Sequence, residues 1–148
     1  MLRPTLIAAL VGAFFFAVVS VASAASLVLR RPATGTITSG FGGVRGHEGV
    51  DFGKLRRLGI VSAARGKVIR TGYLPSYAGY GKVVLIAHPR GFRTLYAHLS
   101  RIRVRPGQRV PADRWIGNAG CTGRCTGTHL HFELRRFGRP LNPLRFLR

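Results

Sequence analysis

The chain has 148 residues, with 24 Lys and Arg against only 4 Asp and Glu, a formal charge of +20 and 2 cysteines. This length indicates one domain with a real core, and the 46% hydrophobic content excludes a wholly disordered chain. Two cysteines exclude a miniprotein held together by a framework of disulfides. The four carboxylates are Glu48, Asp51, Asp113 and Glu133. None is adjacent to another, so histidine chemistry is a better candidate than a carboxylate pair.

Residues 1–24 have the pattern of a secretory signal peptide. Arg3 gives a positive start, Leu6 to Val21 is apolar, and small residues then lead to a cleavage site after Ala24. The alternative is an uncleaved membrane anchor, although the apolar run is shorter than the roughly 20 residues that a span needs. We therefore expect a periplasmic or extracellular protein with no stable membrane span after cleavage.

The positive charge points to anionic partners. Removal of the signal peptide takes one cation and leaves a charge of +19, which would attract anionic envelope polymers to an Arg-rich surface. The cations are scattered along the chain, and no helix-turn-helix, zinc-finger or aromatic RNA-binding signature accompanies them. Nucleic acid is therefore not an expected partner. An arginine-rich genome would also account for part of the charge.

The chain after a short predicted linker at 25–34 consists of short strands in a single domain, residues 35–148. Gly, Pro and Ser recur every eight to twelve residues, and no long segment has helical periodicity. We expect a mainly β domain. The expected strands cover 66–72, 82–87, 93–98, 115–117 and 129–134, with a hairpin at 89–91, short strands around 104–110, and an end to regular structure at 139–143.

The last of these strands carries two histidines on one face. Apolar and polar residues alternate over 129–134, so the apolar side chains share one face of the strand and the polar ones the other. The polar face carries His129, His131 and Glu133. Polar histidines on the inner face of a buried strand indicate a site rather than a packing role.

Two further histidines and an aspartate complete a candidate metal site. His47 lies four residues before Asp51 in a turn-to-strand segment, and His98 ends a predicted strand. Neutral imidazole and carboxylate are usual ligands of zinc, and three protein ligands plus water make a catalytic zinc site. His88 precedes Pro89 at a strand end, and we expect it to be a hydrogen-bonded core or surface residue instead.

Three segments in this order resemble the signatures of the LytM/lysostaphin-type zinc endopeptidases, which cleave peptidoglycan cross-bridges. They are His47-x-Gly49-x-Asp51, Leu95–Ser100 and His129–Glu133. Segments between them match as well, so the resemblance covers roughly residues 35–145. It implies a small antiparallel β-sheet with a narrow groove over a zinc site.

The resemblance also implies roles for single residues. His47, Asp51 and His131 match the zinc ligands, with one zinc per chain, and His98 and His129 match the two unliganded histidines beside the metal. The implied function is that of an exported zinc metalloendopeptidase that hydrolyses peptide cross-links of bacterial peptidoglycan. In this mechanism the two unliganded histidines are the catalytic residues, which transfer protons to and from the water and the leaving amine.

Two alternatives remain open. The family includes degenerate members that have lost ligands and only activate amidases, so a non-catalytic wall-binding or amidase-activating domain is one. The present sequence keeps every ligand, which favours the enzyme. A zinc D-Ala-D-Ala peptidase of another family is the second. Glu133 could hold the other ring nitrogen of His131, or it could be a surface carboxylate.

Two segments depart from the family pattern. Lys54–Gly59 stands where a Gly-Thr-Pro turn is usual, so we expect a differently shaped groove wall there. Cys121 and Cys125 lie four positions apart in a glycine-rich turn, close enough for a disulfide, which needs roughly 4.4–6.8 Å between α-carbons. Export favours such a bond. The alternatives are two extra zinc ligands or two inert thiols.

Overall fold

The computed structural model describes residues 27–44 and 46–148 of the chain. The predicted signal peptide, residues 1–24, lies outside the described residues. Within the described part, no helix has the length and apolar character needed to cross a membrane.

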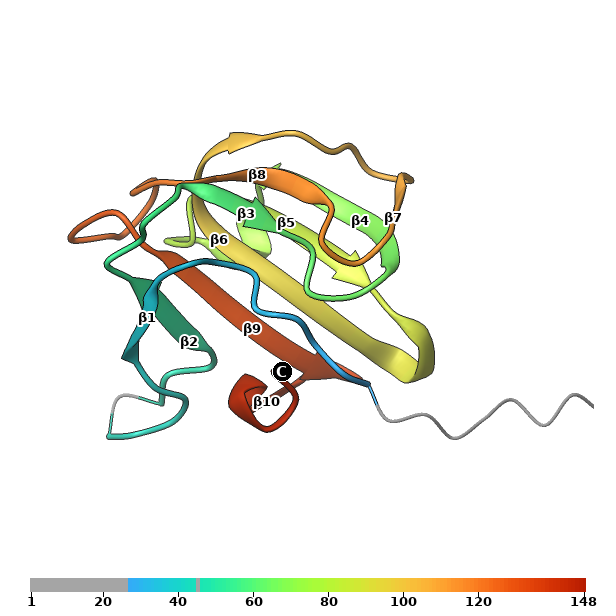
Figure 1. Cartoon of the computed structure of the whole chain (residues 1–148), viewed down its shortest axis with the longest axis horizontal. Coiled ribbons are helices and arrows are strands. Elements are labelled where there is room, and N and C mark those ends of the chain that lie inside the picture. Colours follow the sequence, from blue (N-terminus) through green and yellow to red (C-terminus); the bar gives the residue numbers. More distant parts are fainter. Residues whose placement is uncertain (1–26, 45) are drawn as a thin grey trace, which may run out of the picture.

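Antiparallel strands make up most of the described structure, which confirms the prediction of a mainly β domain (Figure 1). The strands are β1 (Thr36–Ser39), β2 (Val50–Gly53), β3 (Gly59–Val61), β4 (Gly66–Tyr73), β5 (Lys82–Ala87), β6 (Phe92–Ile102), β7 (Arg109–Val110), β8 (Trp115–Ala119), β9 (Leu130–Arg136) and β10 (Arg139–Leu141). Three single-turn 3₁₀ helices connect them: η1 (Pro75–Tyr77), η2 (Pro89–Gly91) and η3 (Pro143–Arg145).

The sheet is centred on two long strands, β6 and β9, which run side by side through the molecule (Figure 1). Its order is β1-β2-β9-β6-β5-β4-β7, while β10 pairs with β9, and β8 pairs with both β3 and β6. The hairpin predicted at 89–91 joins β5 to β6. Strand β9 therefore lies between β2 and β6, so Asp51 of β2, His98 of β6 and His131 of β9 can line one site.

Apolar side chains cover both faces of the central strands. Along β5, Val84 and Ile86 enter the main core, whereas Val83 and Leu85 enter a smaller cluster on the opposite face. This two-sided burial explains why β5 is apolar throughout instead of alternating. Burial of each such side chain stabilises the fold by about 1.5–3 kcal/mol. The core includes the rings of Phe52, Tyr96 and Phe132.

The segment predicted as a linker is packed against the domain over residues 27–34. Leu29 is fully buried. Its N–H donates to the carbonyl of Phe146 at 2.8 Å, and its own carbonyl accepts from the N–H of Arg148 at 2.8 Å. Burial of Leu29 draws the segment into the core. This part of the predicted linker therefore belongs to the folded domain.

The expected end of regular structure at 139–143 is wrong. Arg139–Leu141 forms strand β10, which pairs with β9 and places Pro140 opposite Arg135. Proline is tolerated here because β10 is an edge strand, where one side of the backbone needs no ladder partner. Strand β6 is also longer than the predicted 93–98, since it pairs with β5, β8 and β9 along its length.

His88 is a hydrogen-bonded core residue, as expected. Its Nδ1 lies 2.7 Å from the carbonyl of Arg65, and its Nε2 lies 2.8 Å from Oγ1 of Thr94. The Thr94 hydroxyl is 3.1 Å from that of Tyr96, which accepts from the N–H of Ala63 at 2.8 Å. Burial lowers the pKa of His88, although its bond to the Arg65 carbonyl acts in the opposite direction.

Candidate metal centre and groove

A groove of about 530 Å³ lies over the polar end of strands β2, β6 and β9. All five histidine and aspartate positions proposed from the sequence line it, so the structure brings together every predicted site residue. The remaining lining residues are Ser39, Ala78, Gly79, Tyr80, Arg124, Cys125 and Thr126.

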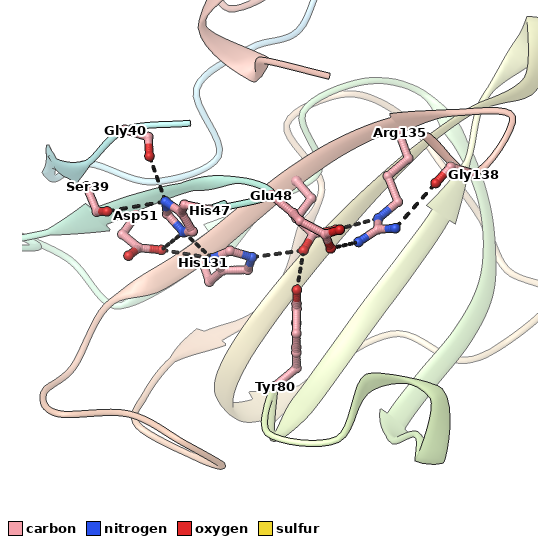
Figure 2. Close-up of polar contacts among 10 residues, drawn as sticks. Ser39, Gly40, His47, Glu48, Asp51, Tyr80, His131, Arg135 and Gly138 are labelled. Atoms are coloured by element: carbon pink, nitrogen blue, oxygen red, sulfur yellow. Dashed lines mark hydrogen bonds and ion pairs between the residues drawn. The ribbon is translucent and has the colours of Figure 1, made fainter. Parts of the chain in front are cut away.

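Three ligand atoms of this groove lie close together. His131 Nδ1 is 2.8 Å from Asp51 Oδ1 and 3.1 Å from His47 Nε2, and the latter two atoms are 3.3 Å apart (Figure 2). Two ligands at 2.0–2.1 Å from a tetrahedral zinc are separated by about 3.3 Å. The donor set and its spacing therefore fit zinc.

The sheet register explains why these residues meet. Asp51 on β2 is directly opposite His131 on β9. His47 is held just before β2 by a two-way backbone pairing with Gly42, with N···O distances of 2.7 and 2.9 Å. Residues 47 and 51 thus approach the neighbouring strand from the same side.

The protein fixes the second ring nitrogen of both candidate histidine ligands. His47 Nδ1 donates to the carbonyl of Gly40 at 2.7 Å and lies 3.2 Å from Ser39 Oγ. His131 Nε2 donates to Glu133 Oε1 at 3.0 Å. Such bonds select the tautomer, which leaves Nε2 of His47 and Nδ1 of His131 for the metal.

His98 and His129 line the same groove, and the ring centroids of His98 and His131 are 6.0 Å apart. His98 Nδ1 donates to the Thr122 carbonyl at 2.8 Å, and His129 Nδ1 donates to the Gly127 carbonyl at 2.7 Å. Their ring centroids are 4.7 Å apart. Each ring therefore has only Nε2 free for chemistry in the groove.

The backbone at His98 is strained. Its φ is +59°, in the left-handed region that is rare for residues other than glycine, and the pairing of β6 with β8 shifts register between Leu99 and Arg101. Burial lowers the pKa of the His98 imidazole, as do the charges of His129 and His131, while the Thr122 carbonyl raises it. The net pKa lies below the usual value.

Glu133 is fully buried and contacts the candidate ligand His131. Besides the bond from His131, its Oε1 accepts a hydrogen bond from the Tyr80 hydroxyl at 2.7 Å, and its Oε2 accepts one from Arg135 Nε at 2.6 Å. Arg135 also donates to Glu48. Glu133 is therefore the partner of His131, and the surface-carboxylate alternative is wrong.

Charges of the cluster shift the ionisation of its members. Burial raises the pKa of Asp51, but the hydrogen bond and charge of His131 bring it below the ordinary value. Burial lowers the pKa of His131, and its bonds to Asp51 and Glu133 raise it to about 9. Burial likewise raises the pKa of Glu133, yet three hydrogen bonds lower it overall. Both carboxylates are therefore ionised at neutral pH.

Sequence reasoning missed Tyr80 and Arg135. Tyr80 stands between two glycines just before the buried strand β5, and its ring packs edge-on against His131 at 5.1 Å between centroids. Burial and the Glu133 hydrogen bond raise the pKa of Tyr80, which keeps it a donor. Arg135 lies two residues after Glu133 and so shares its strand face, which was a usable signal.

A disulfide loop forms one wall of the groove. Cys121 and Cys125 are bonded, with α-carbons 5.3 Å apart, so the disulfide prediction is confirmed and both alternatives are wrong. The N–H of Arg124 donates to the Gly79 carbonyl at 2.7 Å. The segment Lys54–Gly59 does not line the groove. The expectation of a reshaped wall there is wrong, because residues 78–80 and 124–126 form the walls.

Fold and site together define a metallopeptidase-type β domain. The chain belongs to Peptidase family M23, whose description matches residues 45–143. The family recognised from the three motifs is thereby confirmed.

Curated relatives include enzymes and an activator. An uncharacterized metalloprotease of Haemophilus influenzae is 38% identical over 78% of this chain and 22% of its own length. The murein hydrolase activator NlpD of Escherichia coli is 35% identical over 80% of this chain and 31% of its own. The peptidoglycan DD-endopeptidase ShyA of Vibrio cholerae is 41% identical over 67% of this chain and 22% of its own length. The chain thus spans less than a third of these relatives.

Solved structures share the fold. A peptidase M23 from Pseudomonas aeruginosa superposes with a TM-score of 0.73 at 37% identity, covering 82% of this chain and 50% of that one. A zinc-containing peptidase from Vibrio cholerae superposes with a TM-score of 0.65 at 35% identity, covering 78% of this chain and 39% of that one. Lysostaphin from Staphylococcus simulans gives 0.71 at 28% identity, covering 82% and 53%.

Proposed function

We propose that the protein is an exported zinc metalloendopeptidase, periplasmic or extracellular, that hydrolyses peptide cross-links of bacterial peptidoglycan. One observation carries this proposal: three side-chain atoms spaced to bind zinc, and two histidines whose Nε2 atoms are free, line a single groove. The naming of ShyA as a peptidoglycan DD-endopeptidase supports the substrate class.

Each residue of the groove has a role in this reaction. His47, Asp51 and His131 hold the zinc through Nε2, Oδ1 and Nδ1. Bound zinc supplies a Lewis acid, which lowers the pKa of water and polarises a carbonyl. His98 and His129 take the proton of the attacking water at Nε2 and return a proton to the amine that leaves. Their Nδ1–H bonds to main-chain carbonyls keep both rings in the tautomer that can accept.

The test is a digestion of purified muropeptides followed by mass spectrometry. We expect wild-type protein to break a peptide bond of the cross-link, with the direct D-amino-acid cross-link as the expected bond. His131→Ala should lose both zinc, measured by elemental analysis, and activity. His98→Ala should keep its zinc and lose activity. Full activity of the zinc-free His131→Ala protein would contradict the zinc assignment.

A second candidate function rests on the similarity to NlpD, which is named as a murein hydrolase activator. An activator would release no peptide products by itself and would raise the rate of an added peptidoglycan amidase. His98→Ala distinguishes the two functions, because an activator does not use the free Nε2 of this residue. Unchanged amidase activation by His98→Ala, with no peptide cleavage by wild type, would establish the activator.

A further inference from the structure

The four carboxylates of the chain are all paired within the fold. Asp113 bonds Arg30 at 3.0 Å, Glu48 and Glu133 both bond Arg135, and Asp51 faces two histidine ligands. No acidic side chain is left to neutralise any other cation. A guanidinium elsewhere in the described structure therefore has no acidic side chain left to pair with and remains available to an anionic ligand.

Arg124 is such a cation, and it lines the same groove as His98 and His129. Among the residues that the structure describes, none forms a hydrogen bond or ion pair with its guanidinium; only its backbone N–H is bonded. A guanidinium presents a planar fork of donors that matches a carboxylate. Asp51, the one acidic residue that lines the groove, contacts His47 and His131 and is not paired with Arg124.

The loop that carries Arg124 is held rigidly. Gly123 has a φ of +78°, and a Cβ there would lie 2.4 Å from the backbone nitrogen of Gly81, so the two loops interlock without room for a side chain. Thr122 Oγ1 accepts from the N–H of Lys82 at 3.0 Å, and the disulfide closes the loop. The backbone of Arg124 is thus held on a wall of fixed shape, which reduces the ordering that binding through its side chain requires.

We propose that Arg124 is a specificity residue that binds a free carboxylate on the substrate peptide, next to the bond that is cut. This inference rests on the proposed function and deepens it: the preferred substrate is a stem peptide with a free carboxylate beside the cross-link, rather than its amidated form. The disulfide loop fixes the backbone position from which this guanidinium reaches into the groove.

The test compares two synthetic cross-linked stem peptides that differ only in one group, a carboxylate or a carboxamide beside the scissile bond. Affinity for each peptide is measured by NMR titration of the zinc-loaded His98→Ala protein, which is expected not to cleave the peptide. The value of kcat/KM for each peptide is measured with the protein that keeps His98. We expect about a tenfold preference for the carboxylate in both measurements, the size of one charge-assisted hydrogen bond.

Arg124→Gln should lower the affinity and kcat/KM for the carboxylate peptide more than those for the carboxamide peptide and so remove the preference, while Arg124→Lys should retain part of it. Arg105→Gln is the matched control, since Arg105 is also exposed but lies in the turn before β7 and does not line the groove. Equal values for both peptides in wild type, or an equal loss for both in Arg124→Gln, would overturn the inference. Absence of cleavage with an intact affinity difference would instead overturn the proposed function alone.

Discussion

Glu133 accepts a hydrogen bond from Nε2 of His131 at 3.0 Å, so a fully buried carboxylate orients the histidine whose Nδ1 meets Asp51. The same carboxylate holds Arg135 and Tyr80. One buried carboxylate thus connects the candidate ligand His131 to Tyr80 in the groove and to Arg135 on the same strand.

Glu133→Gln should weaken both zinc binding and the fold. The amide would point a donor at Arg135 and leave that cation without its buried partner, so we expect a loss of about 3–5 kcal/mol in unfolding free energy. Misorientation of His131 should lower zinc affinity by about 10–100-fold. Urea unfolding and zinc titration with a competing chelator measure the two effects.

Glu48→Gln is the matched control for this change. Glu48 bonds the same Arg135, but its side chain is 46% exposed, so its loss should cost less than about 1 kcal/mol and leave zinc affinity unchanged. Similar effects of the two substitutions would show that burial of Glu133 is not what matters.

Stability should depend on pH through His88. Burial holds its folded pKa below the unfolded value of 6.5, so the unfolded chain takes up this proton first. His88 makes no pH-dependent contribution to the unfolding free energy where it is neutral in both the folded and the unfolded chain. As pH falls below about 6.5, its protonation in the unfolded chain destabilises the fold increasingly. Between pH 7.5 and 5, His88→Gln should therefore lose less unfolding free energy than wild type in urea titrations. Parallel curves would contradict this.

Loss of the disulfide should affect activity more than stability. The closed loop of Cys121–Cys125 is short, so its entropy contributes only about 2 kcal/mol. Cys125 Sγ is 3.8 Å from Nδ1 of His129, so the shape of the loop affects the position of this proposed catalytic ring. The double variant Cys121→Ser/Cys125→Ser should melt a few degrees lower and lose most of its activity. Two free thiols per denatured, unreduced chain would refute the bond itself.

Positive charge should recruit the protein to envelopes. Lys67 and Arg109 are directly opposite on β4 and β7, a like-charge pair that favours an anionic partner. Because such attraction is screened over about 8 Å at physiological salt, activity on whole envelopes should fall as salt rises. Cleavage of a small uncharged peptide should not. The variant Lys67→Gln/Arg109→Gln should reduce the salt dependence, and equal salt dependence for both substrates would argue against recruitment.

The sequence predicted the parts of the site that depend on local pattern. Alternation over 129–134 placed His131 and Glu133 on one face, and fixed spacing placed His47 beside Asp51. Tyr80 could not be found in this way, because its bond to Glu133 joins residues 53 positions apart and depends on how the loop before β5 folds over β9.

The errors at the ends of the domain have the same origin. Leu29 stands in a short polar and apolar mixture without periodicity, so nothing local reveals that it fills the core. Its burial depends on the chain end around Leu147, with which it forms a parallel bridge. Strand β10 likewise exists because β9 offers it a free edge, and its Pro140 argued against a strand on local grounds.

The bridge between Leu29 and Leu147 brings the two ends of the folded domain to the same place. A short glycine-rich peptide could therefore join residue 148 to residue 27 and close the chain into a ring. New termini could then be opened in the exposed turn at 105–107, which lies outside the strands. Such a circular permutant would keep every strand pairing of the sheet, and the groove would be attached to any fused module from a different side.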